Sequence, residues 1–227
     1  MHEAARKIQA AGIARAAVLL DCESSAVSIE GSRFGSRVSN RNFGWDDLVA
    51  GTVLEASGSG PPGQPTYPHG CHVCEIEIDP ATGAVEIVAY TAVDDFGICL
   101  DREAVTGQVL GGIAQGIGQA LFEDIRLELD SGQLQVGSLM DYGVPRALGM
   151  PPVALTLVES HPCRTNALGV KGCGQAGAIA ALGAVLGAVN DALTRVDARR
   201  VDAPATPPRI WESLVDRPVA RDHQVRA

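Results

Sequence analysis

The fold is decided by residues 106–125, which read TGQVLGGIAQGIGQALFEDI. Apolar residues recur in this stretch at the spacing of one helix face, which predicts a long helix with a buried side. They are Val109, Leu110, Ile113, Ala114, Ile117, Ala120 and Leu121. The helix also contains Gly111, Gly112, Gly116 and Gly118, which at about 1 kcal/mol each relative to alanine lower its stability by roughly 4 kcal/mol. Two explanations stay open: close packing of another backbone, or close approach of a cofactor to a helix N-terminus at 106–108.

A second glycine motif, GVKGCGQAG at 169–177, stands directly before an alanine-rich helix predicted for residues 176–196. The N–H groups in the first turn of a helix lack partners within it, so this loop is a good site for an anion or a polar ligand. Lys171 in the motif is one of only two lysines among eighteen basic residues. Its ammonium either holds a phosphate or a carbonyl, or it is a surface lysine at a turn.

The residues on either side of the first helix read mainly as strands. Residues 72–79 alternate apolar and acidic side chains, a turn follows at 80–83, and a second strand runs to Tyr90, which together predict a hairpin. A turn at Asp130-Ser131-Gly132 then leads into a strand predicted for residues 134–142.

The N-terminal part reads as a smaller peripheral unit. It is expected to hold a helix at 3–20, a hairpin around Gly31 and a short helix at 45–56, followed by a Gly-, Ser- and Pro-rich linker at 57–65. Strands and helices therefore come in blocks, which favours the α+β class with two subdomains. The predicted organisation is a small α+β segment with its linker at 1–65, a main domain at 66–215 and a polar tail at 216–227.

Composition excludes several classes of partner. With 46% apolar and 20% charged residues the chain can build a core, and its net charge of −9 offers no basic surface for nucleic acid or anionic membrane. The longest apolar run, 176–189, is shorter than the roughly 18 residues of a spanning helix, and Arg15 interrupts any leader-like stretch. Six scattered cysteines imply reduced thiols, so we expect a cytoplasmic protein.

Three further groups of residues are weaker candidates for chemistry. A metal cluster is suggested by His69, Cys71, His72 and Cys74, but an extended chain points Cys71 and Cys74 to opposite faces, so we expect no zinc site there. Cys173 is expected to pack or to line a pocket rather than to react. The acids Asp94, Asp95 and Asp141 could supply a catalytic carboxylate, although acids at strand ends are more often solvated.

Four segments, in order and spacing, resemble the molybdenum hydroxylase family of xanthine dehydrogenase, aldehyde oxidoreductase and carbon monoxide dehydrogenase. They are PTYPHGCHVCEIEIDPATGAVEI, VDDFGICLDREAVTGQVLGGIAQGIGQALFED, GSLMDYGVPRA and TNALGVKGCGQAGAIAALGAVLGAVNDAL. The likeness is to the C-terminal part of the molybdopterin-binding subunit and runs from residue 67 to 214, more loosely back to residue 1. It implies an α+β fold and a molybdopterin with molybdenum, commonly the cytosine dinucleotide form in bacteria. Iron–sulfur clusters and FAD are then expected on partner subunits.

The resemblance also implies which residues form the site. Gln108 falls where the family places a glutamine near the metal and pterin, and Gly107 beside it allows close approach. Lys171, Gly172 and Gly174 fall in the loop that lies against the active site, so the resemblance makes them cofactor-binding residues as well. No protein ligand to molybdenum is expected, because the pterin holds the metal.

One position departs from the family. Its catalytic glutamate, the general base in the KGxGE motif, corresponds here to Gln175. An amide cannot accept a proton near neutral pH, and a positioned base typically contributes about 10² to 10⁴ in rate, so ordinary hydroxylation should be impaired while cofactor binding need not be. Gln175 is alternatively a specificity residue that hydrogen-bonds a different substrate.

Residues 1–227 do not include the preceding half of the family's molybdenum region. The chain can therefore supply one wall of the site, and we expect a partner chain that carries the other half, together with a small-molecule substrate. The alternative is a non-catalytic truncated relative that acts as an interaction or scaffold subunit.

Overall fold

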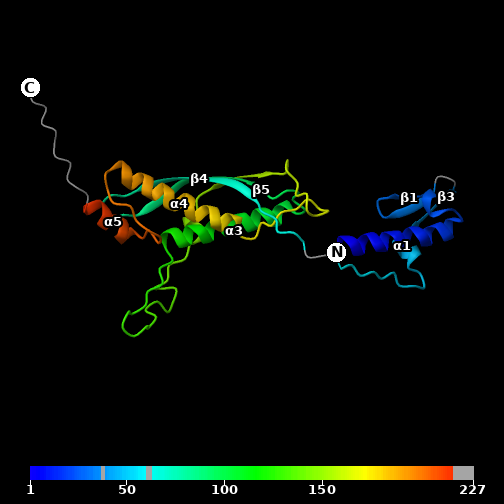
Figure 1. The fold of residues 1–227 in the computed structure, drawn as a ribbon, viewed down its shortest axis with the longest axis horizontal. Coiled ribbons are helices and arrows are strands. Elements are labelled where there is room, and N and C mark those ends of the chain that lie inside the picture. Colours follow the sequence, from blue (N-terminus) through cyan, green and yellow to red (C-terminus); the bar gives the residue numbers. More distant parts are fainter. Residues whose placement is uncertain (37–38, 60–62, 217–227) are drawn as a thin grey trace, which may run out of the picture. The chain divides into compact units, whose positions relative to one another are not determined.

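Two units with separate cores make up the chain. The computed structural model describes residues 1–36, 39–59 and 63–216. It divides into Met1–Gly63 and Gln64–Ala227, each a mixture of helices and strands, which confirms the predicted α+β class (Figure 1). Residues 60–62 of the predicted linker and 217–227 of the predicted tail lie outside the described residues.

The first unit packs one long helix on a small antiparallel sheet. The predicted helix at 3–20 and the hairpin around Gly31 are both confirmed, and Gly31 has the positive φ of +61° that this turn requires. A third strand adds to the hairpin, in the order β1-β2-β3. The elements are α1 (His2–Leu20), β1 (Val27–Glu30), β2 (Arg33–Ser36) and β3 (Ser39–Gly44).

The core of this unit gathers around Phe34. Its ring meets the Trp45 ring edge to face, with centroids 4.8 Å apart. A side chain at Gly12 on α1 would lie 2.9 Å from the Trp45 ring, so a glycine is needed for the helix to approach. The predicted helix at 45–56 is wrong in length: α2 (Trp45–Leu48) is one turn long, and Gly51 with a φ of +75° follows it.

The second unit is built on a three-stranded sheet. The predicted hairpin is confirmed as β4 (His69–Ile78) and β5 (Val85–Asp95), which pair antiparallel, with Gly83 at a φ of +73° in the turn. A third strand, β6 (Val153–Val158), pairs parallel to β5. The sequence did not predict β6, because its partner strand lies some 60 residues earlier in the chain.

Three helices accompany this sheet. They are α3 (Arg102–Leu121), α4 (Ala176–Arg195) and α5 (Pro207–Val215). The helix predicted at 106–125 is found as α3, but both of its predicted ends are wrong by four residues. It starts at Arg102 because the Asp101 carboxylate caps it by accepting from the Ala104 N–H at 2.9 Å, and it ends at Leu121. The predicted helix N-terminus at 106–108 is therefore wrong, since those residues lie inside the helix. The predicted helix at 176–196 is confirmed as α4, whereas α5 was not predicted.

Glycines let α3 and α4 pack closely. A Cβ added at Gly116 would lie 2.6 Å from the Ala181 Cβ, and one at Gly177 would lie 2.3 Å from the Val109 carbonyl oxygen. A Cβ at Gly112 would also be too close, at 2.9 Å from the Ala178 nitrogen. Close packing therefore explains these glycines of the crossing. It does not explain Gly107 and Gly111, since a Cβ at either would have no neighbour within 4 Å.

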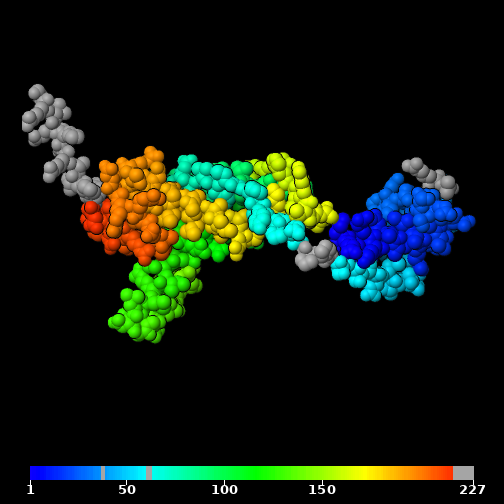
Figure 2. Space-filling model, in the orientation of Figure 1, coloured from blue at the N-terminus to red at the C-terminus, as the bar shows by residue number. Residues whose placement is uncertain are grey.

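Residues 122–150 leave the end of α3 and return to β6 as an extended arm of the second unit (Figures 1 and 2). The predicted turn at Gly132 is confirmed by its φ of +68°, but the predicted strand at 134–142 is wrong. Only an isolated bridge joins Leu127 and Leu134 there. Strand pairing needs a neighbouring extended segment, and the second half of the arm has none.

Helix α4 is strongly apolar. At 20 residues with a mean hydropathy of 1.6, it is long and apolar enough to cross a membrane by length and composition alone. We expected the apolar run at 176–189 to be too short for a membrane span, but the helix that contains it is long enough by this measure. Its buried residues, among them Ala181, Val185 and Val189, join the core beneath the sheet, and one such helix is weak evidence for a span.

Candidate functional site

The two glycine motifs predicted to form the site meet in the structure. The Gln108 side chain, in the second turn of α3, donates a hydrogen bond of 2.7 Å from Nε2 to the carbonyl oxygen of Gly174. Gly174 is followed directly by Gln175, and all three residues are exposed. Two segments 66 residues apart thus form one continuous surface.

This surface is open at its glycines. Neither Gly107 nor Gly174 has any atom within 4 Å of where a Cβ would stand, so a ligand can approach the backbone at both. Gly172 is anchored from the other side, because its N–H donates to the Thr66 Oγ1 at 3.0 Å. The loop before α4 is consequently held both by α3 and by the segment that leads into β4.

Gln175 is the N-cap residue of α4. Its side chain makes no capping hydrogen bond, so the first N–H groups of the helix have no side-chain acceptor from this residue. The helix N-terminus also carries partial positive charge, which favours an anionic or polar group in front of it. The structure thus places Gln175 at an exposed helix end, directly after the Gly174 carbonyl that accepts from Gln108.

The Lys171 side chain is mostly buried and is not part of this exposed site surface. Its Nζ forms an ion pair of 2.9 Å with the Asp95 carboxylate, and the two side chains are 9% and 14% exposed. Burial alone would raise the pKa of Asp95, but the Gly97 N–H at 2.8 Å and the Lys171 ammonium together lower it below its usual value. The alternative of a surface lysine is wrong. The prediction that Lys171 binds the cofactor gains no support from these contacts.

Backbone hydrogen bonds join the same loop to the end of β5. The Lys171 N–H donates to the Phe96 carbonyl at 2.8 Å, and the Ile98 N–H donates to the Gly169 carbonyl at 3.0 Å. Gly97 lies between them with a φ of +64°, and a Cβ there would stand 2.1 Å from the Gly169 oxygen. The ion pair and this short ladder therefore position the loop that carries Gln175.

A buried polar cluster in β4 and β5 accounts for two weaker candidates. His72 Nδ1 is hydrogen-bonded to Tyr90 Oη at 2.9 Å, and its Nε2 lies 3.2 Å from the Asp94 carboxylate. The His72 and Asp94 side chains are 1% and 4% exposed. A side chain at Gly70 would overlap Asp94 Oδ1, which makes the glycine necessary. Asp94 is thus engaged inside the sheet, and burial raises the pKa of Tyr90.

Sequence reasoning missed this cluster because its members are brought together by strand register. The available signal was the alternation of β4, which points His72 and Cys74 to the same face. Across residues 1–36, 39–59 and 63–216, no group of three or more His, Cys, Asp or Glu side chains could hold a metal ion.

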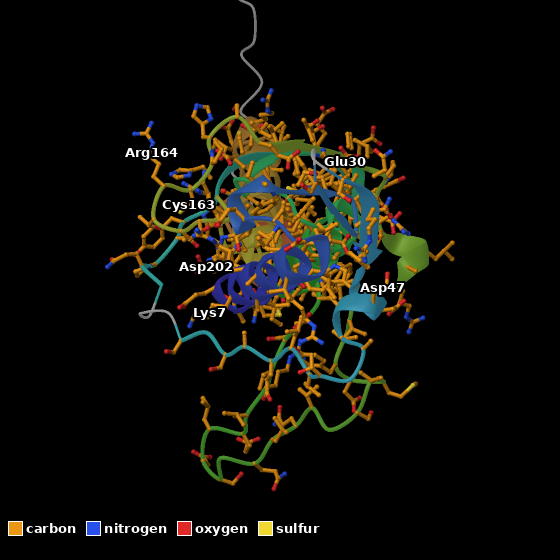
Figure 3. All side chains as sticks on the ribbon, turned by 90° about the vertical axis from the view of Figure 1, so that its right-hand side faces the viewer. Lys7, Glu30, Asp47, Cys163, Arg164 and Asp202 are labelled. Atoms are coloured by element: carbon orange, nitrogen blue, oxygen red, sulfur yellow. The ribbon has the colours of Figure 1, made fainter. Side chains whose placement is uncertain are left out.

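The remaining cysteine and acid candidates have ordinary surroundings. Cys173 is partly buried and packs against the core of the second unit, as predicted. Cys163, in the loop beside the outward-pointing Arg164, contacts Thr165 Oγ1 at 3.1 Å, and this hydrogen bond lowers the pKa of its thiol (Figure 3). Asp141 lies in the arm and accepts from Ser138 Oγ at 3.2 Å. None of these contacts marks a catalytic group.

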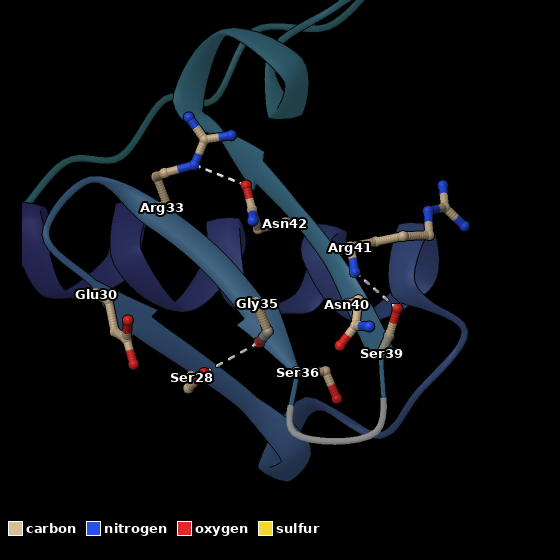
Figure 4. A pocket seen from close by; sticks show the side chains of 9 residues that line it. All are labelled: Ser28, Glu30, Arg33, Gly35, Ser36, Ser39, Asn40, Arg41 and Asn42. Carbon is tan, nitrogen blue, oxygen red and sulfur yellow. Dashed lines mark hydrogen bonds between the residues drawn. The ribbon is translucent and has the colours of Figure 1, made fainter.

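A polar hollow of about 280 Å³ lies on the small sheet of the first unit (Figure 4). Two of its lining residues are joined by a hydrogen bond, which Arg33 Nε donates to Asn42 Oδ1 at 2.7 Å. None of the predicted site residues lines it. It is the open face of the β1-β2-β3 sheet rather than part of the candidate site.

Comparison with known proteins identifies the family of the chain. A family model for the molybdopterin cofactor-binding domain matches residues 1–151. The nicotine 6-hydroxylase large subunit of Paenarthrobacter nicotinovorans is 38% identical over 65% of this chain and 18% of its own length. The carbon monoxide dehydrogenase large chain of Hydrogenophaga pseudoflava is 29% identical over 96% of this chain and 28% of its own length.

Solved structures agree on the fold. Quinoline 2-oxidoreductase from Pseudomonas putida 86 superposes with a TM-score of 0.82 and 32% identity, over 93% of this chain and 28% of that one. The chain thus spans between about a fifth and just over a quarter of the length of these relatives. Since the family model covers about two thirds of the chain, the family resemblance is confirmed. This chain belongs to the molybdopterin cofactor-binding family of the molybdenum hydroxylases.

Proposed function

We propose that this chain forms one wall of the cofactor site in a molybdenum-dependent oxidoreductase that acts on aldehydes or N-heterocycles. A partner chain that carries the preceding half of the molybdenum region completes the site. The observation that carries the proposal is the hydrogen bond from Gln108 to Gly174, which brings the two glycine motifs into one surface.

The residues of that surface fit a large polar cofactor. Molybdopterin with molybdenum supplies the redox chemistry when it is bound, and its phosphate and pterin groups need hydrogen-bond partners on the protein. Gln108 uses one N–H on Gly174 and keeps a second N–H and its amide oxygen for a ligand. Open backbone at Gly107 and Gly174 and the N-terminus of α4 provide room and partial positive charge.

Lys171 has a different part in the proposal. Its ammonium is engaged by Asp95, so we assign it to positioning the loop, while Gly172 and Gly174 face the cofactor. Metal contacts from protein side chains are not part of the proposal, because the pterin holds the molybdenum.

The wider assembly follows from the relatives by analogy. We propose the cytosine dinucleotide form of the cofactor, iron–sulfur and FAD groups on partner subunits, and a cytoplasmic location without nucleic acid or membrane partners. Partner subunits are supported by the matched relatives, which include a large subunit and a subunit gamma of a dehydrogenase complex. The cofactor form and the groups on those subunits rest on the family resemblance, and the location and excluded partners rest on composition.

Gln175 is expected to limit the turnover of the assembled enzyme. Its exposed amide stands at the end of α4 where the family has a general base, and an amide cannot take a proton. Loss of a positioned base lowers rates by about 10² to 10⁴, so turnover of ordinary family substrates should be weak. A substrate that needs a hydrogen-bond donor at this position would instead be bound specifically by Gln175.

The same residue favours a second candidate, a non-catalytic interaction or scaffold subunit. Metal analysis separates the two: molybdenum and released pterin are measured per chain, first on the chain alone and then after co-expression with the preceding half. Stoichiometric molybdenum only in the co-expressed complex supports the proposed function. Its absence from both preparations contradicts it and leaves the scaffold.

A glutamate restored at position 175 tests the chemistry in the same complex. We expect Gln175→Glu to raise hydroxylase turnover by about 10² or more, because it returns the proton acceptor. Gln9→Glu on the exposed face of α1 adds the same charge at a residue that is not part of the candidate site, and it should leave turnover unchanged. Unchanged turnover in Gln175→Glu, with molybdenum bound, favours the scaffold.

A further inference from the structure

The arm at residues 122–150 has no core of its own. None of its residues is buried, yet it carries nine exposed large apolar side chains. They are Phe122, Ile125, Leu127, Leu129, Leu134, Leu139, Met140, Val144 and Leu148. Leu129, Met140 and Leu148 are between 93% and 100% exposed. Exposed apolar side chains gathered in one segment indicate an interaction site, because covering apolar area that faces water lowers the free energy.

Polar contacts give the arm a defined path. The Glu128 N–H donates to the Gln133 carbonyl at 2.8 Å, and the Gln135 N–H donates to the Arg126 carbonyl at 2.9 Å. At its base, the Tyr142 hydroxyl donates to Glu123 Oε2 at 2.7 Å. The arm therefore presents its apolar side chains on a backbone whose shape these bonds already restrict, which lowers the entropy cost of binding.

The base of the arm also holds an apolar hollow of about 550 Å³. Apolar residues that line it are Ile117, Phe122, Leu139, Val144, Leu148 and Met150. Interfaces gain most of their binding energy where large side chains of one partner fill such a hollow in the other. The arm and its hollow thus have the form of one half of a protein interface.

We infer that the arm is the docking surface for the polypeptide that carries the preceding half of the molybdenum region, an inference that rests on the proposed function. The first reason is length. The shared segment is only 18% to 28% of the length of the matched relatives, so the polypeptide that surrounds this segment in them has no counterpart within residues 1–227.

The second reason is charge, which disfavours a second copy of this chain. The arm carries five carboxylates and only two guanidinium groups, and the whole chain has a net charge of −9. Two copies joined through their arms would bring like charges together, which is unfavourable for association. An apolar partner surface that is neutral or basic at its rim fits the arm better.

Binding of the co-expressed preceding half to the full chain tests the inference. Leu129→Asp, Met140→Asp and Leu148→Asp place a charge on the arm at positions so exposed that folding should not change. Val18→Asp and Val53→Asp are matched controls, since these valines are 80% and 83% exposed outside the arm. We expect each arm variant to raise the dissociation constant about tenfold or more, and each control to change it less than twofold.

Three outcomes would overturn the inference. The arm variants could bind like the unaltered chain, no complex could form at all, or the chain alone could form a dimer that the arm variants dissociate. Molybdenum content is measured separately on the same complex. A complex that depends on the arm but holds no molybdenum contradicts the proposed function alone, whereas a molybdenum-loaded complex that ignores the arm variants contradicts this inference alone.

Discussion

The Asp95–Lys171 ion pair lies beside the backbone bonds that hold the loop before α4. We expect Lys171→Met to loosen that loop, because it removes the ammonium partner of a carboxylate that is only 14% exposed. Amide hydrogen exchange in peptides covering 95–98 and 169–171 should become faster by about tenfold, which corresponds to about 1.4 kcal/mol of lost local stability.

The only other lysine offers a matched control. Lys7 pairs with Glu3 at 3.1 Å, but both side chains are about half exposed, so the pair contributes little. Lys7→Met should therefore leave the exchange of its own helix almost unchanged. Equal effects of the two substitutions would show that the Asp95–Lys171 pair does not position the loop.

The lowered pKa of Asp95 predicts how the stability of the second unit depends on pH. Its pKa is lower in the folded chain than its usual value near about 3.9, so its contribution to stability is present above that value and is lost as pH falls through the lowered pKa. Urea unfolding of the second unit should show a stability advantage over Asp95→Asn near pH 7 that shrinks below about pH 4. A constant difference across this range would contradict the assignment.

Single site residues were predictable where the family resemblance matched them to a position of the cofactor site. Gln108 and Gln175 were singled out this way, and the structure brings their segments together. The His72–Asp94 pairing was not predictable, because it depends on the register between two strands and on a glycine at position 70 that leaves room for the carboxylate. The ion pair of Lys171 was not predictable either. Its partner Asp95 lies 76 positions away, so no local sequence pattern indicates the pair.

The crossing of α3 and α4 allows a test of two glycines in one helix. Gly111→Ala should stabilise the second unit by up to about 1 kcal/mol, because alanine favours a helix and its methyl group would stand in open space. Gly116→Ala gains the same propensity but forces its methyl group to 2.6 Å from the Ala181 Cβ. We expect a net loss of about 1–3 kcal/mol.

Urea unfolding of the two glycine variants is the measurement. The pair is matched in residue type, helix and substitution, so only the neighbouring helix distinguishes them. Similar changes for Gly111→Ala and Gly116→Ala would mean that close packing does not explain the glycine content of α3.

Helices and strands were predictable where apolar residues repeat at regular spacing over a long, continuous stretch of sequence. Helices α3 and α4 and the β4–β5 hairpin meet that condition, although the start of α3 was set by the cap at Asp101 rather than by apolar spacing. Strand β6 is short and depends on parallel pairing across the intervening helix, and the arm contains alternating apolar residues without a partner strand. Local pattern carries no information about either circumstance.

The candidate site occupies an exposed wall of the second unit rather than an enclosed cavity. Gln108, Gly174 and Gln175 lie at the surface. An oxidoreductase site that excludes water needs further protein in front of this wall, and the arm provides apolar area through which such protein could attach. Under the proposed function, polypeptide that the matched relatives have outside the shared segment would cover both the wall and the arm.

Separate cores predict that the two units unfold independently. The core around Phe34 shares no residue with the core around Ile113, and each unit contains one tryptophan, Trp45 in the first and Trp211 in the second. Phe34→Ala should lower the unfolding free energy of the first unit by about 3–5 kcal/mol, and Ile113→Ala that of the second by about 2–5 kcal/mol. Each should leave the other unit within about 0.5 kcal/mol.

Fluorescence in urea separates the two transitions. Trp211→Phe leaves Trp45 as the reporter of the first unit, and Trp45→Phe leaves Trp211 as the reporter of the second. If Phe34→Ala shifted the Trp211 transition as strongly as the Trp45 transition, the two cores would form one cooperative structure. Independent transitions would instead mean that the second unit, which holds the α3–α4 crossing, the arm and the candidate site, is stable without the first and can be studied alone with its partner.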